Sequence, residues 1–162
     1  MDLVSLLEKS FIEISELIQY QNSLELSNLQ NENNCSGDDV KKIDQLSNDI
    51  LKENLSSCEL IRMIGSEEED ELCETSFKNA PYLVCYDPLD GSSNIGVNIT
   101  TGTIFGIYEY DENNKIKSGR NLVMSGYCLY GGCTQFLLNK DNKLSFYQLN
   151  KEKKFDLLVD DL

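Results

Sequence analysis

Two stretches of helical periodicity, followed by a series of short strand-like segments, constrain the fold of this chain more than any other feature. Apolar residues recur every three or four positions over the first twenty or so residues, and again from about Asp39 to Ser57. This spacing predicts two amphipathic helices, each with one face directed into a core. With strands after them, the order of elements predicts a layered α/β or α+β fold, in which amino-terminal helices pack on a mixed β-sheet.

Short apolar segments of strand length occupy most of the chain after the second helix. They are ELIRMIG (59–65), YLVCY (82–86), TGTIFGIYEY (101–110), CTQFLLNK (133–140), LSFYQLN (144–150) and KFDLLVD (154–160). Because only DNK separates the fourth segment from the fifth, these two predict a hairpin. The Gly-punctuated segment GRNLVMSGYCLYGG (119–132), in contrast, predicts a short helix.

The connection between the two helices has a different composition from the rest of the chain. Residues 21–37 are rich in Asn, Ser and Gln and end in NENNCSG. This composition predicts a mobile surface loop, which we interpret as a tolerated insertion. The length of 162 residues is that of one compact domain, so we expect a single domain over 1–162.

The charge balance excludes several classes of partner. Fourteen basic and 28 acidic residues give a formal net charge of -14, which repels nucleic acid and anionic membrane surfaces. The same charge repels a phosphorylated substrate, so phosphate chemistry would require divalent cations. The chain contains no His, which removes Ser-His and Cys-His relays and imidazole zinc sites. Any catalysis would therefore rest on carboxylates, hydroxyl groups and metal.

The cysteines and the apolar runs indicate a compartment. None of the six cysteines forms a C-x-x-C pair, and no basic segment precedes an apolar stretch at the amino terminus. This pattern favours reduced thiols in a cytoplasmic protein. No apolar run approaches the roughly 20 residues that a membrane span needs, so we expect no membrane association.

Acidic residues follow two of the predicted strands. Asp87 and Asp90 flank a Pro-Leu pair directly after YLVCY, and the run SEEEDE follows ELIRMIG. Proline bends the chain so that both aspartates can face one point, and hard oxygen donors so close together suit Mg²⁺. Gly91, Ser92 and Ser93 then offer backbone N–H groups and hydroxyls of the kind that cradle a phosphate. Each motif alone also fits an ordinary turn or a solvated face, but their coincidence at strand ends favours a site.

Asp44 interrupts the apolar stripe of the second predicted helix. At 100° per residue it projects between Leu51 and Leu55, at the margin of the buried face. A carboxylate there needs a partner or a metal, unless it turns back to solvent at the rim. The residues themselves leave both interpretations open.

These motifs resemble the signature of a known enzyme family. CYDPLDGSSNI followed by TGTIFGIY is similar to the fructose-1,6-bisphosphatases, and GDDVKKIDQLSND, GSEEED and GRNLVMSGYCLYGG resemble that family's neighbouring blocks in the same order. The resemblance covers Ser36 to about Leu138. It implies a sugar-phosphatase-like fold and Mg-dependent removal of the 1-phosphate of fructose 1,6-bisphosphate, a step of gluconeogenesis. It also implies a homotetramer.

The resemblance further implies a role for individual residues. Metal, Mg²⁺ with Mn²⁺ as a substitute, would be held by Glu67, Glu68, Asp87, Asp90 and the backbone carbonyl of Leu89. Water would be activated by Glu68 with Asp44, and Asp38 matches an acidic position at the edge of the family's mobile catalytic loop. The sugar phosphate would contact Asp90, Gly91, Ser92 and Ser93.

The chain departs from the family pattern in three ways. Gly96 stands where the family has an Asp, and Pro81 and Glu109 stand where vertebrate members present basic residues to AMP, so we expect no AMP inhibition. The family also continues into a second domain, which supplies another metal-binding Glu and most sugar contacts. The chain therefore corresponds to a fragment, half of a split enzyme or a truncated relative. Alternative functions are a non-catalytic regulatory or assembly relative and an inositol-phosphate phosphatase.

Overall fold

The computed structural model describes residues 2–28, 38–113, 115–116 and 118–162. For residues 21–28, 38–42 and 96 it describes the backbone but not the side chains. In these parts of the chain, two α-helices precede eight strands and two short 3-10 helices. The elements are α1 (Leu3–Asn28), α2 (Asp38–Ser56), β1 (Ile61–Ser66), β2 (Cys73–Glu74), β3 (Tyr82–Asp90), η1 (Ser92–Val97), β4 (Thr101–Glu109), η2 (Gly119–Asn121), β5 (Leu122–Tyr130), β6 (Thr134–Lys140), β7 (Lys143–Leu149) and β8 (Phe155–Val159).

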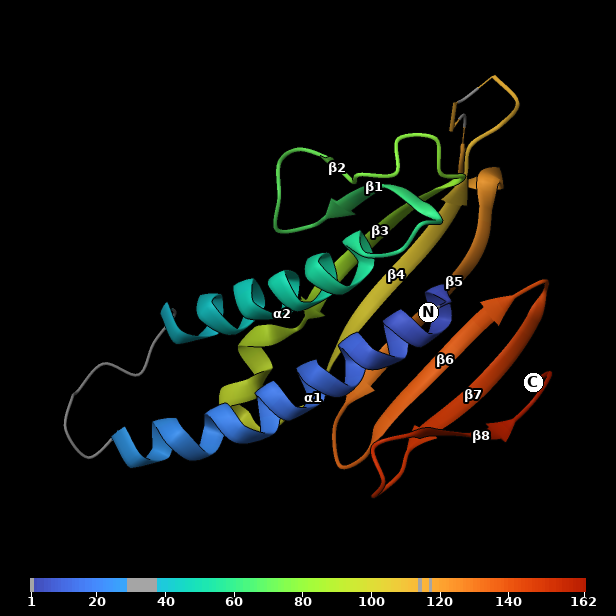
Figure 1. The fold of residues 1–162 in the computed structure, drawn as a ribbon. Coiled ribbons are helices and arrows are strands. Elements are labelled where there is room, and N and C mark those ends of the chain that lie inside the picture. The colour runs from blue at the N-terminus through green and yellow to red at the C-terminus, as the bar shows by residue number, and fades with distance from the viewer. Residues whose placement is uncertain (1, 29–37, 114, 117) are drawn as a thin grey trace.

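Helices α1 and α2 lie side by side across one face of the sheet, as Figure 1 shows. The apolar stripe of each helix is buried as its periodicity predicts, with Leu7 and Phe11 of α1 and Leu51 and Leu55 of α2 fully enclosed. Asp2 caps α1, because its carboxylate accepts the backbone N–H of Ser5 at 3.0 Å. Neither helix has, over its described residues, the length of uninterrupted apolar sequence that a bilayer crossing requires.

The strands form one mixed sheet in the order β2-β1-β3-β4-β5-β6-β7-β8. Only β1 and β3 pair in parallel among the described strands, and all other neighbours are antiparallel. Strands β6 and β7 form the predicted hairpin, whose turn residues Asp141 and Asn142 adopt positive φ. Strand β8, also predicted, lies at the edge of the sheet, where β7 is its one partner among the described strands.

Two expectations about local structure were wrong. Within 119–132 only the short η2 is helical, and residues 122–130 form β5, hydrogen-bonded between β4 and β6. Gly126 permits this pairing, because a Cβ atom there would collide with the carbonyl oxygen of Leu137. The predicted loop 21–37 is helical as far as Asn28, the end of α1, because the stretch lacks Gly and Pro and contains good helix formers. The rest of that loop, 29–37, falls outside the described residues.

The two faces of the sheet differ in what covers them. Along β4, Phe105 and Ile107 point towards the helices and are buried, whereas Ile104, directly before Phe105, is 48% exposed. The covered face holds an aromatic cluster in which the rings of Phe11, Phe105 and Phe136 lie with centroids 5.1 to 6.2 Å apart. No described element packs over the opposite face, which we call the open face.

Candidate active site

The parallel pairing of β1 and β3 brings the two acidic segments together. Ser66 at the end of β1 pairs with Tyr86 in β3, and the backbone N–H of Glu67 donates to the Tyr86 carbonyl at 3.0 Å. Because parallel strands deliver their carboxyl ends to the same edge of a sheet, Glu67 and Glu68 emerge beside Asp87. The prediction that two strands deliver acids at their carboxyl ends is therefore confirmed, and the parallel pairing places both ends at one edge.

A bulge in β3 shapes the segment from Asp87 to Asp90. Asp87 pairs with Ile104 and Asp90 with Gly102, so β3 holds one residue more than β4 between these pairs. The Asp87 carboxylate accepts the N–H of Leu89 at 3.0 Å. Pro88 has no N–H group to donate to β4. Its carbonyl oxygen accepts a hydrogen bond of 2.8 Å from the hydroxyl of Thr103.

Thr103 is a supporting residue that the sequence reasoning missed. Its hydroxyl also hydrogen-bonds the hydroxyl of Tyr130 at 2.7 Å, and both side chains are buried. The bulge that carries the aspartates is thus tied to β4 and β5. The signal available in the sequence was weak, because a Thr in an apolar strand is also common without any such role.

Asp44 lies at the same end of the sheet, on α2. It is 9% exposed, which agrees with its predicted place at the margin of the buried face. Burial raises the pKa of Asp44, the Ser92 side chain lowers it by hydrogen bonding, and the negative charge of Glu67 raises it. Asp44 therefore faces Glu67, which follows β1, and Ser92, which begins η1, and it does not turn back to bulk solvent.

The site carboxylates repel one another. The pKa of Asp87 is raised by burial and then by the charges of Asp90, Glu67 and Asp44, against a lowering by the N–H of Leu89. The pKa of Glu68, although this side chain is exposed, is raised by partial loss of hydration and then by the charges of Asp44, Glu67 and Asp87. Among the side chains that the structure describes, no cationic group contributes to these shifts or to that of Asp44. Within this part of the chain, the negative charge of the cluster is therefore uncompensated.

The oxygen donors of the site suit a hard divalent cation, although their side chains do not converge on one point. Within the described residues, no three acidic or cysteine side chains converge closely enough to hold a metal ion. The donors are carboxylate oxygens, which Mg²⁺ prefers, and their mutual repulsion is the kind that a cation relieves. Glu67, Glu68 and Asp90 are exposed, so their side chains retain the rotamer freedom to converge on an ion.

The segment that follows Asp90 has an unusual backbone conformation. Gly91 caps η1 with φ of 74° and ψ of 25°, a left-handed conformation that residues with a Cβ atom adopt at a cost. Ser92 and Ser93 then begin η1 beside Asp44 and Asp90, and Ser93 is exposed. The structure thus brings together the predicted phosphate-contacting residues and the acids.

The site is continuous with the open face of the sheet. A groove of about 590 Å³ runs along that face, and Glu67 and Asp87 form part of its lining beside Cys85, Ile104 and Tyr108. The acids consequently lie at the rim of an apolar surface. Whatever covers the open face would also border the acids.

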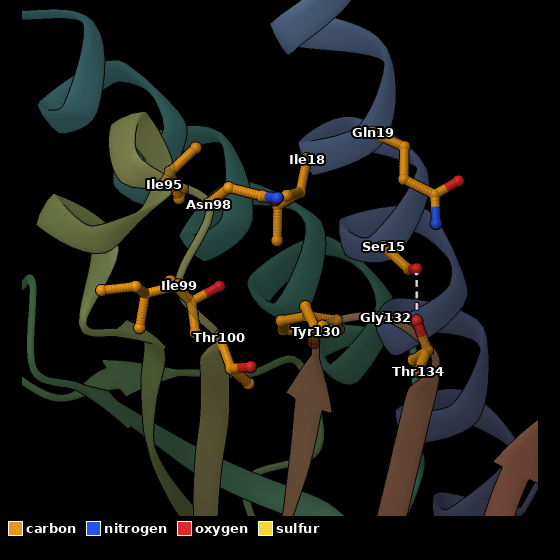
Figure 2. Close-up of a pocket in the computed structure, with 12 residues that line it drawn as sticks. Ser15, Ile18, Gln19, Ile95, Asn98, Ile99, Thr100, Tyr130, Gly132 and Thr134 are labelled. Atoms are coloured by element: carbon orange, nitrogen blue, oxygen red, sulfur yellow. Dashed lines mark hydrogen bonds between the residues drawn. The ribbon is translucent and has the colours of Figure 1, made fainter.

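A more enclosed pocket of about 310 Å³ lies on the helix side of the sheet, and Figure 2 shows its lining. Ser15 of α1 and Thr134 of β6 close one wall through a hydroxyl–hydroxyl hydrogen bond of 2.7 Å. Its described lining residues are neutral, so the pocket offers a phosphate no cation and a metal no carboxylate. We therefore assign the candidate site to the acids and not to this pocket.

Comparison with known proteins identifies the family of the chain. The family model described as "Fructose-1-6-bisphosphatase, N-terminal domain" matches residues 1–160. The chain belongs to the fructose-1,6-bisphosphatase family. Fructose-1,6-bisphosphatase class 1 of Shewanella frigidimarina is 41% identical over 133 residues, covering 79% of this chain and 40% of the relative. The class 1 enzyme of Shewanella sediminis is 36% identical over 162 residues, covering 97% of this chain and 49% of the relative.

A solved structure of the family has the same fold. Fructose-1,6-bisphosphatase of Leishmania major in holo form matches with a TM-score of 0.83 and 27% identity, over 98% of this chain and 50% of the other. The predicted fold class, helices on a mixed sheet, is therefore confirmed. The chain spans about half the length of the fructose-1,6-bisphosphatases that it matches.

Some site predictions remain predictions. The side chain of Asp38, at the first residue of α2, and the surroundings of Gly96 lie outside the described part of the chain. Leu89 is buried and the role of its carbonyl is untested. Pro81 and Glu109 lie near the opposite end of the β3–β4 pair from the acids, where Tyr82 pairs with Glu109.

Proposed function

We propose that this chain supplies the metal-binding and catalytic half of an enzyme that hydrolyses the 1-phosphate of fructose 1,6-bisphosphate in gluconeogenesis. The observation that carries the proposal is the cluster of mutually repelling carboxylates beside Gly91 and two serines, whose charge no described cationic side chain compensates. Membership of the fructose-1,6-bisphosphatase family supplies the substrate. Every residue of the cluster is also an acid that the family pattern requires.

Each group of residues has a distinct task in this proposal. Glu68 and Asp44 accept the proton of the attacking water, a role that their raised pKa values suit. Asp90, Gly91, Ser92 and Ser93 contact the sugar phosphate, with the backbone of Gly91 free to approach it closely. The bulge and Thr103 keep Asp87 and Asp90 at one edge of the sheet.

Mg²⁺, or Mn²⁺ in its place, would be held by Glu67, Glu68, Asp87, Asp90 and the carbonyl of Leu89. When bound, the metal supplies charge neutralisation at the phosphoryl oxygens and a lower pKa for the attacking water. The carboxylates in turn lose their mutual repulsion on binding it. Substrate capture by this chain alone should be poor, since a net charge of -14 repels a bisphosphate.

Three further properties belong to the same proposal. We expect a cytoplasmic protein and a homotetramer, which the family resemblance suggests. We also expect no micromolar AMP site, since Pro81 and Glu109 stand where a phosphate would need cations. Titration of the chain with AMP in a calorimeter checks this last expectation, and saturable micromolar heat would contradict it.

The decisive experiment joins the chain to the second half of a relative. Phosphate release with Mg²⁺ is measured for the 162-residue chain, for its fusion to the carboxyl-terminal half of the Shewanella sediminis enzyme, and for that fusion with Glu68→Gln. The chain alone should be nearly inactive, because a misplacement of about 1 Å can reduce a rate roughly a hundredfold and whole contacts are missing. Glu68→Gln should reduce the activity of the fusion by at least about a hundredfold.

Glu71→Gln is the matched control, since Glu71 is an exposed acid in the same loop with no assigned role. It should leave the fusion's activity within about twofold. An inactive fusion that still binds Mn²⁺ would favour the non-catalytic relative. Equal losses from both substitutions would show that the base is misassigned.

A further inference from the structure

A hydrogen-bonded network joins α2 to the loop that carries Glu67 and Glu68. In that loop, the Glu69 carboxylate accepts the Asn48 amide at 3.0 Å and the Lys52 ammonium at 2.7 and 2.8 Å. The Asn48 oxygen in turn accepts the hydroxyl of Tyr86 in β3 at 3.0 Å. Three elements, α2, the loop after β1 and β3, are thus connected through one set of polar side chains.

The same three elements carry the site acids. Asp44, Asn48 and Lys52 are spaced by four residues, so they form one stripe along α2, and Asp44 belongs to the site. Tyr86 directly precedes Asp87, and Glu69 directly follows Glu68. Asn48, Tyr86 and Glu69 therefore each lie within four residues of a site carboxylate on the same element. Lys52 lies four residues beyond Asn48.

The network is largely enclosed. Asn48 has no exposed surface and Tyr86 is buried, so both of their polar groups require the partners that they have. Glu69 is half-buried, and both of its oxygens are engaged by donors. A carboxylate whose oxygens are already occupied in this way is not available as a metal ligand without breaking the network.

Glu69 differs from its neighbours in charge compensation. Glu69 is paired with Lys52 and accepts a hydrogen bond from Asn48, whereas Glu68 lies among the acids Asp44, Glu67 and Asp87. Without the network, repulsion among the site acids would drive the exposed loop away from α2 and β3. Lys52 opposes this repulsion through its contact with Glu69, whose carboxylate oxygen lies 2.7 Å from the Lys52 ammonium.

We propose that Glu69 is a positioning residue, which Lys52 and Asn48 hold against α2 so that Glu67 and Glu68 stay beside Asp87 and Asp44. The inference rests on the proposed function, because it assigns the purpose of the network to divalent-metal binding. In this role Glu69 contacts neither metal nor substrate. Its effect on the site passes through the conformation of the loop.

The test compares Lys52→Met, Lys52→Arg and the control Lys78→Met in the full 162-residue chain. Lys78 is 74% exposed and its ammonium lies 3.9 Å from Glu74, so its replacement removes the same charge without touching the network. Two readouts are used, Mn²⁺ affinity by calorimetry and hydrogen exchange of the metal-free chain. The informative amides are those of Glu67 and Glu69, which donate to the carbonyls of Tyr86 and Ser66.

Lys52→Met should weaken Mn²⁺ binding about tenfold, at unchanged stoichiometry, as substitutions behind metal ligands commonly do. It should also speed exchange of both amides. Lys52→Arg should restore affinity to within about threefold, because a guanidinium can still donate to both Glu69 oxygens. Lys78→Met should change neither readout.

Each alternative outcome has one meaning. Equal effects of Lys52→Met and Lys78→Met would mean that the loss of any positive charge weakens metal binding. This result would overturn the proposal. Unchanged exchange of both amides in Lys52→Met would do the same, because the loop would then be held by other contacts. If the wild-type chain binds no Mn²⁺, the proposed function fails, and the exchange data still decide whether the network anchors the loop.

Discussion

The covered and open faces of the sheet are built from the same strands, yet only one of them is closed by this chain. On β4, alternate residues go to the two faces, and Phe105 and Ile107 are buried under the helices while Ile104 is 48% exposed. On β5, Cys128 and Tyr130 are buried whereas Tyr127 is 39% exposed. An antiparallel sheet that faces water normally alternates apolar with polar residues, but here both faces are apolar.

The difference teaches where stability and function reside. The covered face forms the buried core with the two helices, and its aromatic cluster is enclosed there. The open face contributes little to stability, because its apolar groups remain in water, and it leads to the rim where Glu67 and Asp87 lie. We therefore expect substitutions on the two faces to affect different measurements.

The largest effect on stability should come from the covered face. Phe136→Ala removes a fully buried ring that packs on Phe11, Phe105 and Tyr147. It should lower the free energy of unfolding by about 3 to 5 kcal/mol, measured by urea denaturation. Phe136→Leu, which keeps most of the volume, should lose much less. A loss below about 1 kcal/mol for the Ala variant would mean that the cluster is not the core.

The site at the rim should show the opposite pattern. Asp90→Asn should weaken Mn²⁺ binding by at least about tenfold, since it removes an anionic oxygen donor, while leaving the urea midpoint nearly unchanged. Asp156→Asn, on β8 and also exposed, removes the same charge far from the site in sequence and fold. Equal Mn²⁺ titrations for wild type and Asp90→Asn would exclude Asp90 from the metal site.

The open face should tolerate a polar residue. Ile104→Thr keeps the β-branched shape that strands favour and should change the free energy of unfolding by no more than about 0.5 kcal/mol. It should also reduce binding of a fluorescent apolar dye to the native chain. The matched covered-face variant Ile107→Thr, at a position with no exposed surface, should be strongly destabilised. Similar losses for both variants would mean that the two faces do not differ.

A small, pH-dependent effect is expected at the start of α1, on the covered side. The N–H and hydroxyl of Ser5 lower the pKa of Asp2 below its ordinary value of 3.8. The charged cap therefore stabilises the folded chain above about pH 4, and this stabilisation is lost as the pH falls through the folded-state pKa. Asp2 is exposed and screened, so Asp2→Ala should cost only about 0.5 to 1 kcal/mol at pH 7. The difference between wild type and variant should shrink towards pH 3, in urea titrations at each pH. A constant difference would exclude the charged cap.

Much of this arrangement could be predicted from the sequence, because its signals were local. The periodicity of α1 and α2 and the apolar runs of most strands determine those elements directly. Asp87 and Asp90 were found because Pro and Gly beside acids are a local signal. The covered face was likewise predicted from the helical stripes that pack on it.

The failures occurred where neighbours in space decide the structure. Residues 122–130 lack charges and have no clear period, so only pairing with β4 and β6 distinguishes strand from helix. The Asn-rich stretch after Gln21 predicted a loop, although α1 continues to Asn28. Glu69 could not be separated from the other acids of its run, because its partners come from α2. The four-residue spacing of Asp44, Asn48 and Lys52 was the one available hint.

The position of β8 at the edge of the sheet has a consequence for handling the protein. Its outer backbone groups meet no described strand, and Leu157 and Leu158 are about half exposed. An edge of this kind is a template for strand addition, and repeated addition produces fibrils. Asp156, Asp160 and Asp161 around the edge oppose such growth through electrostatic repulsion between copies. We therefore expect polymerisation to be triggered by acidification towards the isoelectric point near 4.3 or by high salt, and suppressed by storage at neutral pH and low ionic strength.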